Sequence, residues 1–218
     1  MVSNESFQLS SICNQKGTVM ADFLIGISDK KFKIIINYEL VDIFIDELTP
    51  FAKFFGVSFK KTHNHVCASI ESSPFSKRVF LKNSDFALSV TIKNEIKSID
   101  KSISKEEWSI ANMILGNFYL SKDDVGNYRP LEINYDKHRV SFNKGCFRGQ
   151  EVVARMKYLG VDRRKFCTII SKKEIQVNKD LKMLGEPLRL QDNFVCLCII
   201  KKDFLEIFKR ENPSITII

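Results

Sequence analysis

The residues best suited to chemistry lie in one short segment, 144–151, whose sequence is KGCFRGQE. Cys146 stands between Gly145 and Gly149, which tolerate positive φ angles and let a ligand approach the backbone. The cationic side chains nearby in the sequence are Lys144, Arg148 and Arg155. Cations favour the thiolate, the form of cysteine that acts as nucleophile or metal ligand. The segment therefore predicts an accessible, reactive thiol, and the alternative is a buried cysteine that fills a tight corner.

The flanking sequences predict how this segment is held. Residues 139–143 (RVSFN) alternate in character and predict a strand, whereas the residues after the segment predict a helix. The apolar face of that helix would contain Val152, Val153, Met156 and Leu159. Cys146 is thus expected at the apex of a strand-to-helix turn, where the free N–H groups that open the helix also favour an anion.

The composition is typical of a soluble globular protein. The chain has 218 residues, of which 44% are apolar, so it can bury a substantial core. No apolar run approaches the roughly 18 residues that span a bilayer. Six cysteines lack a disulfide-framework or zinc-site spacing and predict free thiols. Because the start of the sequence shows no export or organelle signal, a cytoplasmic location is expected.

The net charge of +8 suits an anionic partner but does not identify one. Nucleic acid, a polyglutamate tail and phosphate would all be compatible with it. His63 and His65 lie two residues apart without a third ligand in the pattern, so we interpret them as surface residues and expect no metal site.

The first third of the chain predicts a β-meander over residues 9–36. Asp22 falls inside its second strand and is either a surface residue or faces a cavity, and the pattern favours the surface. Residues 38–48 predict an amphipathic helix, and Thr49-Pro50 predicts the start of a second, short helix. Further strand-like stretches occupy residues 57–70 and 78–92.

The middle of the chain contains two polar residues of interest. A capping box at residues 104–107 predicts a helix, on whose buried side Asn112 would face either a hydrogen-bonding neighbour or a cavity. Pro130 predicts an extended segment over residues 129–134, which leads towards the central turn and would bring Glu132 near Cys146.

The pattern of apolar residues changes beyond Gly160. Short apolar strands are predicted at residues 166–170, 187–190, 194–200 and 204–208, without a helix signal. Cys196 and Cys198 would share one side of a strand, and we interpret the pair as core residues. The chain is accordingly divided into residues 1–160 and a small β domain, a barrel or sandwich, over residues 161–218.

Segment 144–151 resembles the K-G-C-[FY]-x-G-Q-E motif of the YgfZ family of folate-binding proteins. These proteins are relatives of the glycine-cleavage T-protein (aminomethyltransferase) and support iron–sulfur cluster assembly or repair. Pro130-x-Glu132 and Asn14-x-Lys16-Gly17 followed by Asp22 resemble other family segments. The resemblance implies an α+β fold of two interwoven α/β lobes (1–160) and a small C-terminal β-barrel-like domain (161–218), arranged as a cloverleaf around a central folate channel.

The resemblance also implies roles for individual residues. Cys146 would be the catalytic thiolate, and Glu132 would grip the pterin of tetrahydrofolate by accepting two N–H bonds. The further cofactor-binding residues expected are Asp22, Asn112, Lys144 and Arg155. The sequence departs from the family at Asn112-Met113, where Arg-Ile is usual. It also has Ala21-Asp22 where the T-protein relatives have an Asp-Asp pair, which disfavours aminomethyl transfer.

Three functions are compatible with these features. The first is a tetrahydrofolate-binding accessory factor for iron–sulfur cluster assembly or repair, a non-turnover protein that supports tRNA modification indirectly. Its partners would be a folate derivative and iron–sulfur client proteins, with no membrane or direct nucleic-acid contact, and a monomer is expected. The alternative is a folate-dependent aminomethyl or one-carbon transferase that needs Asp22. The third, based on net charge alone, is a basic RNA-binding module.

Overall fold

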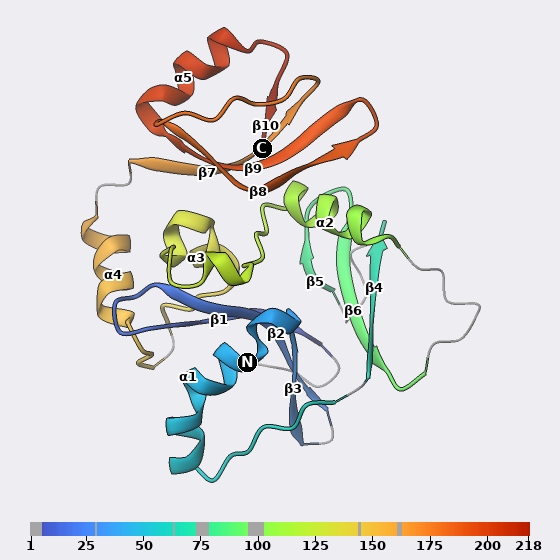
Figure 1. The fold of residues 1–218 in the computed structure, drawn as a ribbon, viewed down its shortest axis with the longest axis vertical. Coiled ribbons are helices and arrows are strands. Elements are labelled where there is room, and N and C mark those ends of the chain that lie inside the picture. Colours follow the sequence, from blue (N-terminus) through green and yellow to red (C-terminus); the bar gives the residue numbers. More distant parts are fainter. Residues whose placement is uncertain are drawn as a thin grey trace.

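The computed structural model describes residues 6–28, 30–62, 64–72, 79–95, 103–143, 145–160 and 163–218. These residues form three antiparallel sheets with helices packed against them (Figure 1). The expected mixture of helices and antiparallel sheets is therefore confirmed. None of the three described sheets closes into a barrel, so the prediction of a barrel-like C-terminal domain was wrong. No helix in the described ranges is both long and apolar enough to cross a membrane.

The first sheet is the predicted meander, in the order β1 (Gln8–Cys13), β2 (Val19–Ser28) and β3 (Lys31–Ile36). Because side chains alternate between the faces of a strand, β2 serves two cores. Ala21 and Phe23 face the main core with helix α1, whereas Leu24 faces the second core.

The helix that follows the meander is continuous. After the short 3-10 turn η1 (Tyr38–Leu40), helix α1 runs from Val41 to Phe54 and contains Pro50, so the predicted second helix was wrong. The Thr49 hydroxyl donates to the Ile45 carbonyl at 2.7 Å instead of capping a new helix. Pro50 itself is exposed.

The second sheet has the order β4 (His65–Glu71), β6 (Ala87–Lys93) and β5 (Val79–Lys82). The strand-like stretch predicted over residues 57–70 is confirmed from His65 onwards but was wrong for residues 57–62 and 64, and His63 lies outside the described residues. Helix α2 (Lys105–Ile114) packs against this sheet and carries the predicted capping box, in which the side chains of Ser104 and Glu107 each accept from the other's backbone N–H.

The connection from α2 to the central turn consists of short helical pieces. They are η2 (Lys122–Asp124), η3 (Pro130–Ile133) and α3 (Tyr135–His138), and the long helix α4 (Gln150–Leu159) follows the turn. The predicted extended segment at 129–134 was wrong, since Pro130 occupies the first position of η3, where its missing N–H is tolerated. The predicted strand at 139–143 was also wrong, because Arg139 turns inward to a buried ion pair.

The third sheet lies beyond residue 163, in the order β10 (Thr216–Ile217), β7 (Arg164–Ser171), β9 (Asn193–Lys201) and β8 (Leu181–Leu190). The predicted strand at 204–208 was wrong, because these residues lie in helix α5 (Lys202–Glu211). Phe204, Leu205 and Phe208 have the spacing of one helix face and cover the outer side of the sheet.

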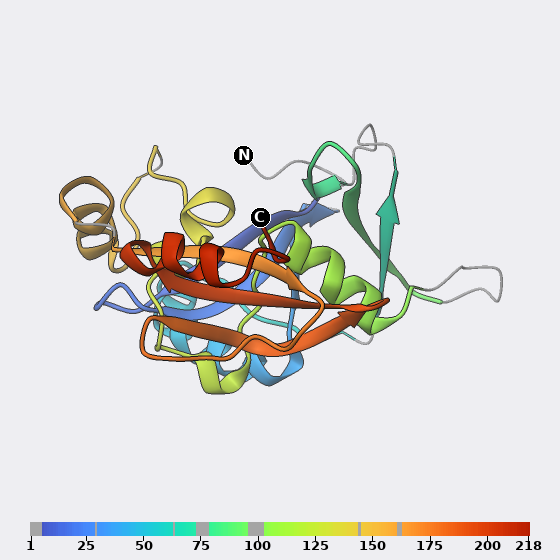
Figure 2. The ribbon, with the colours of Figure 1, turned by 90° about the horizontal axis from the view of Figure 1, so that it is seen from above.

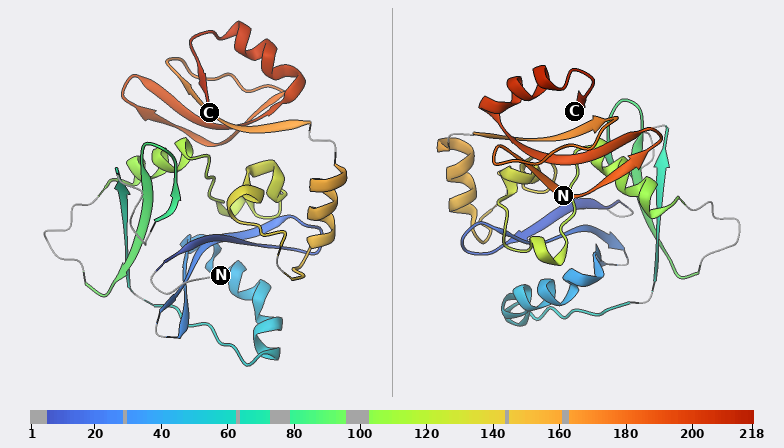
Figure 3. Two further views of the ribbon diagram at one scale, coloured as in Figure 1. Left: turned by 180° about the vertical axis from the view of Figure 1, so that it is seen from behind. Right: turned by 45° about the horizontal axis from the view of Figure 1, so that its top comes forward.

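The third sheet lies between α5 and the rest of the molecule (Figure 1 and, from above, Figure 2). Its inner face contributes Val195, Leu197 and Ile199 to the main core. The outer face buries Cys196 and Cys198, which confirms the interpretation of this pair as core residues. Seen from behind, α3 and α4 lie between this sheet and β1 (Figure 3). The division at residue 160 stays a prediction.

Candidate functional site

The turn that carries Cys146 (residues 145–149, called the cysteine turn below) is held by close contact between two segments that are far apart in sequence. Gly149 has a φ of +77°, and a Cβ added there would lie 2.4 Å from the Asn14 carbonyl oxygen and 2.8 Å from the Gly17 Cα. Only glycine therefore fits where the β1–β2 turn meets the start of α4. Gly145, the other glycine that tolerates a positive φ, does not lie in the left-handed region.

Side chains also fix both segments from within. The Asn14 side-chain oxygen accepts from the backbone N–H groups of Lys16 and Thr18 at 2.9 and 3.1 Å, which shapes the β1–β2 turn. The Gln150 side-chain oxygen accepts from the Phe147 N–H at 3.0 Å, which closes the turn that carries the cysteine. Helix α4 is anchored by Val153, which is fully buried. Leu159 is 80% exposed, so its predicted place on the buried apolar face of this helix was wrong.

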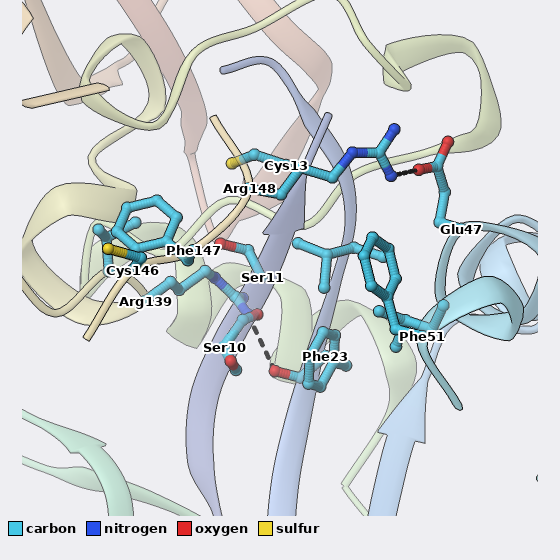
Figure 4. Close-up of a pocket in the computed structure, with 13 residues that line it drawn as sticks. Ser10, Ser11, Cys13, Phe23, Glu47, Phe51, Arg139, Cys146, Phe147 and Arg148 are labelled. Carbon is cyan, nitrogen blue, oxygen red and sulfur yellow. Dashed lines mark hydrogen bonds and ion pairs between the residues drawn. The ribbon is translucent and has the colours of Figure 1, made fainter. Parts of the chain in front are cut away.

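Cys146 is exposed at the apex of this turn, which confirms the accessible thiol and excludes the corner-filling alternative. It borders a pocket of about 420 Å³ between β1, α1 and the cysteine turn (Figure 4). The lining residues are Ser10, Ser11, Ile12, Cys13, Phe23, Glu47, Leu48, Phe51, Arg139, Val140, Cys146, Phe147 and Arg148. Cys146 also lines a shallower hollow on its other side, together with Gln15 and the first turn of α4. The thiol thus stands between two recesses.

Arg148 connects the cysteine turn to α1. Its guanidinium forms an ion pair with Glu47, and both side chains are largely covered (Figure 4). This pair closes one side of the pocket and ties the position of the thiol to helix α1.

Beneath the pocket lies a buried ion pair between Arg139 and Asp22. The Arg139 Nη2 atom is 3.2 Å from the Asp22 Oδ2 atom, and the two side chains are 0% and 1% exposed. The expected surface position of Asp22 was therefore wrong. Burial raises the pKa of Asp22, and the Arg139 charge and the Leu120 N–H, which donates to Asp22 at 3.2 Å, oppose that shift. The carboxylate faces its protein partners and is not among the lining residues.

Aromatic rings surround the guanidinium of this pair. Its central carbon lies 4.6 Å from the ring centre of Tyr135 and 5.0 Å from that of Tyr119, within the range of cation–π contact. Burial raises the pKa of Tyr135 well above its usual value, so its hydroxyl stays protonated and donates to the Phe118 carbonyl at 2.9 Å. Arg139 is consequently held in one orientation.

The other predicted cofactor residues that the structure describes, Glu132, Asn112 and Arg155, are not among the lining residues of the pocket. Glu132 accepts from the Arg129 N–H at 2.8 Å as a cap of η3 and does not line the pocket. Asn112 is buried, and its side chain donates to the Trp108 carbonyl and accepts from the Asn117 side chain. Of the two alternatives for Asn112, a hydrogen-bonding neighbour or a cavity, the structure therefore has the first. The exposed Arg155 pairs with Glu151 at 2.8 Å. Lys144 lies outside the described residues.

Sequence reasoning missed Ser11, Glu47 and Arg139 as members of the site. A signal for Arg139 was present, because a carboxylate inside the apolar strand at Asp22 requires a buried cation. In the described part of the chain, no three His, Cys, Asp or Glu residues come together in a way that could hold a metal ion.

The sequence matches several curated proteins named "tRNA-modifying protein YgfZ". It is 26% identical to the one from Buchnera aphidicola over 80% of this chain and 65% of the relative. It is 27% identical to the one from Blochmanniella pennsylvanica over 74% of this chain and 53% of the relative. The match to the Colwellia psychrerythraea protein is 36% identical but covers 39% of this chain and 28% of the relative. No family model matches the chain. The chain thus covers less than two thirds of the length of each of these relatives.

Proposed function

The chain belongs to the YgfZ family, and from this premise we propose that it is a tetrahydrofolate-binding accessory factor for iron–sulfur cluster assembly or repair. Cys146 is its reactive thiolate. Iron–sulfur proteins are its clients, and it supports tRNA modification indirectly through iron–sulfur enzymes that modify tRNA.

The observation that carries this proposal is the exposed Cys146 thiol at the edge of a pocket of about 420 Å³. A thiol in that position can reach both a bound ligand and a partner protein. The hollow on the other side of Cys146 is open, as an approach surface for a partner requires. A purely structural cysteine would be buried, as Cys167, Cys196 and Cys198 are.

The pocket lining is compatible with the pterin ring of a folate. Phe23, Phe51 and Phe147 provide aromatic walls against which a flat ring can pack. The carboxylate in the lining is Glu47, which is suited to accept N–H groups of the ring. Tetrahydrofolate, when bound, supplies a carrier for one-carbon units.

Glu132 remains the carboxylate that the family resemblance implies for the pterin. Asp22, Asn112, Lys144 and Arg155 likewise remain proposed contacts. The one-carbon transferase is less well supported, because it needs the carboxylate of Asp22, which is buried in its pair with Arg139.

A titration of the purified protein with tetrahydrofolate, followed by calorimetry under reducing conditions, tests ligand binding. Glu47→Gln and Glu132→Gln remove one charge each with almost no change of shape, and an amide oxygen can still cap η3. If the lining carboxylate grips the pterin, Glu47→Gln should weaken binding about tenfold or more, whereas Glu132→Gln should not. The reverse result would restore the role that the resemblance gives Glu132, and absence of binding would contradict the proposal.

The role of the thiol is tested separately in cells that lack their own YgfZ protein. Cys146→Ser should bind tetrahydrofolate within about threefold of the unmodified protein, because the hydroxyl is nearly isosteric with the thiol. It should nevertheless fail to restore iron–sulfur enzyme activity, because a hydroxyl is far less readily ionised. Full restoration by this variant would show that the thiolate is dispensable.

A further inference from the structure

The floor of the pocket contains hydrogen-bonding atoms without a protein partner. The Oγ atom of Ser11 and the Nε atoms of Arg139 and Arg148 are buried, and none of the three has a hydrogen-bond partner. All three residues line the pocket. Buried polar atoms are nearly always paired, and leaving one unpaired costs about 1–3 kcal/mol. The Arg148 side chain is one-third exposed and pairs with Glu47 at the edge of the pocket, whereas Arg139 is fully buried. The unpaired atoms of Ser11 and Arg139 therefore indicate that a ligand atom completes them.

The Arg139 guanidinium can offer only one of its donors to a ligand. Its Nη1 atom donates to the carbonyl oxygens of Ser10 and Phe23 at 3.2 and 3.3 Å. Its Nη2 atom donates to the Asn117 side-chain oxygen at 3.0 Å and pairs with Asp22. Because a guanidinium has five N–H groups, the Nε–H is the remaining donor. Figure 4 shows the side chain extending past Ser11 towards Phe23, with its bond to the Phe23 carbonyl oxygen dashed.

The charges around the pocket indicate the kind of atom that the free donor meets. Among the lining residues, Arg139 is matched by Asp22 behind it, and Arg148 is matched by Glu47. A carboxylate placed at the floor would be an additional, uncompensated charge in a poorly solvated position, which is costly. An uncharged oxygen acceptor satisfies the N–H and the hydroxyl without that cost.

We propose that Ser11 and Arg139 form a recognition pair for an uncharged oxo oxygen on a flat ring of the ligand. The Ser11 hydroxyl rotates to donate one hydrogen bond to this oxygen. The Arg139 Nε–H, whose orientation is fixed, donates the second hydrogen bond to it. The aromatic side chains of Phe23, Phe51 and Phe147 hold the plane of the ring. This inference rests on the proposed function, in which the 4-oxo group of the pterin is the oxygen that is recognised.

Calorimetry with two ligands that differ at this one group tests the pair. In the 4-amino analogue of tetrahydrofolate, an NH₂ donor replaces the oxo acceptor and would face two donors. The unmodified protein should bind tetrahydrofolate at least about tenfold more tightly than the analogue. Ser11→Ala should weaken tetrahydrofolate binding about three- to tenfold and reduce the preference for the oxo compound. Ser10→Ala, at the neighbouring position of β1, keeps its carbonyl contact with Arg139 and should change neither value.

The outcomes separate this inference from the proposed function. If the unmodified protein binds no tetrahydrofolate, the proposed function fails and the recognition pair fails with it. If tetrahydrofolate binds but Ser11→Ala behaves like Ser10→Ala, or the 4-amino analogue binds equally well, the recognition pair alone is overturned. Binding of p-aminobenzoylglutamate that Ser11→Ala weakens would assign the two donors to a carboxylate and would also overturn it.

Discussion

The two parts of the molecule on either side of residue 160 differ in how they place charges and thiols. The part before it buries an ion pair, Asp22–Arg139, and the thiol of Cys13, but it exposes the thiol of Cys146. The described part after it buries three thiols and no charged side chain. The buried cysteines lie on strands that α5 covers, whereas Cys146 lies on a turn between two recesses.

This difference shows that the same residue type acquires its chemistry from its position. Burial raises the pKa of Cys167 to about 11 and raises that of Cys198 further, so both stay protonated and inert near neutral pH. Their role is to fill space between the sheet and α5. The exposed Cys146 can meet a reactant, and the buried charges below it orient the pocket floor. The following predictions test the contrast, from the largest effect to the smallest.

Removing one partner of the buried pair should have the largest effect on stability. Asp22→Asn leaves Arg139 as an uncompensated buried charge, so the free energy of unfolding should fall by about 3–5 kcal/mol. Urea unfolding measures this loss. The exposed pair Arg155–Glu151 is the control, because Glu151→Gln should cost less than about 0.5 kcal/mol. Equal losses in the two variants would show that the Asp22–Arg139 pair does not stabilise this part of the chain.

The contact between the two turns should have the next largest effect. Gly149→Ala forces a side chain into a left-handed backbone position and against the Asn14 carbonyl, so it should destabilise the protein by about 2–4 kcal/mol. Gly145→Ala is the matched control, because a Cβ there meets no atom within 4 Å and the backbone is not left-handed. Thermal unfolding distinguishes the two variants, and comparable shifts in Tm would refute the argument.

The buried thiols predict a loss of stability in alkaline solution. The pKa of Cys167 rises from 9.0 to about 11 on folding, so the folded state binds the proton more tightly than the unfolded state does. The contribution of this thiol to the free energy of unfolding is complete below pH 9. It is lost as the pH rises to 11, by about 1.4 kcal/mol per pH unit. Urea unfolding at pH 8.5 and pH 11 should show a smaller decrease for Cys167→Ala than for the unmodified protein. An unchanged decrease would mean that this thiol does not titrate with unfolding.

Replacing the exposed thiol should have the smallest effect on stability. Cys146→Ser should change the free energy of unfolding by less than about 0.5 kcal/mol, because the side chain is at the surface. It should nevertheless abolish the fastest reaction with a thiol reagent at pH 8 in the native state. Cys167, Cys196 and Cys198 should react only after unfolding in urea. Rapid native-state labelling of these three would contradict the contrast between the two parts of the chain.

Local patterns in the sequence determined many of the elements and the position of the reactive thiol. The meander, the capping box of α2, helix α4 and the exposed Cys146 follow from turn residues, caps and periodicity within a few positions, so they were predictable. Helix α5 was missed because four of the five residues 204–208 are apolar, which also suits a short strand, and only the packing of the helix on the third sheet decides between the two.

Only the tertiary structure decided what surrounds the thiol. The sequence motif placed Gly149 three residues after Cys146, but it did not show that Asn14 and Gly17, more than 130 residues earlier in the chain, contact this glycine. It favoured a surface position for Asp22 and a strand through Arg139, because an ion pair between residues so distant leaves no periodic signal in either segment. The physical reason is that charge pairing, burial and unsatisfied donors depend on which segments meet in space, and a linear pattern records only near neighbours.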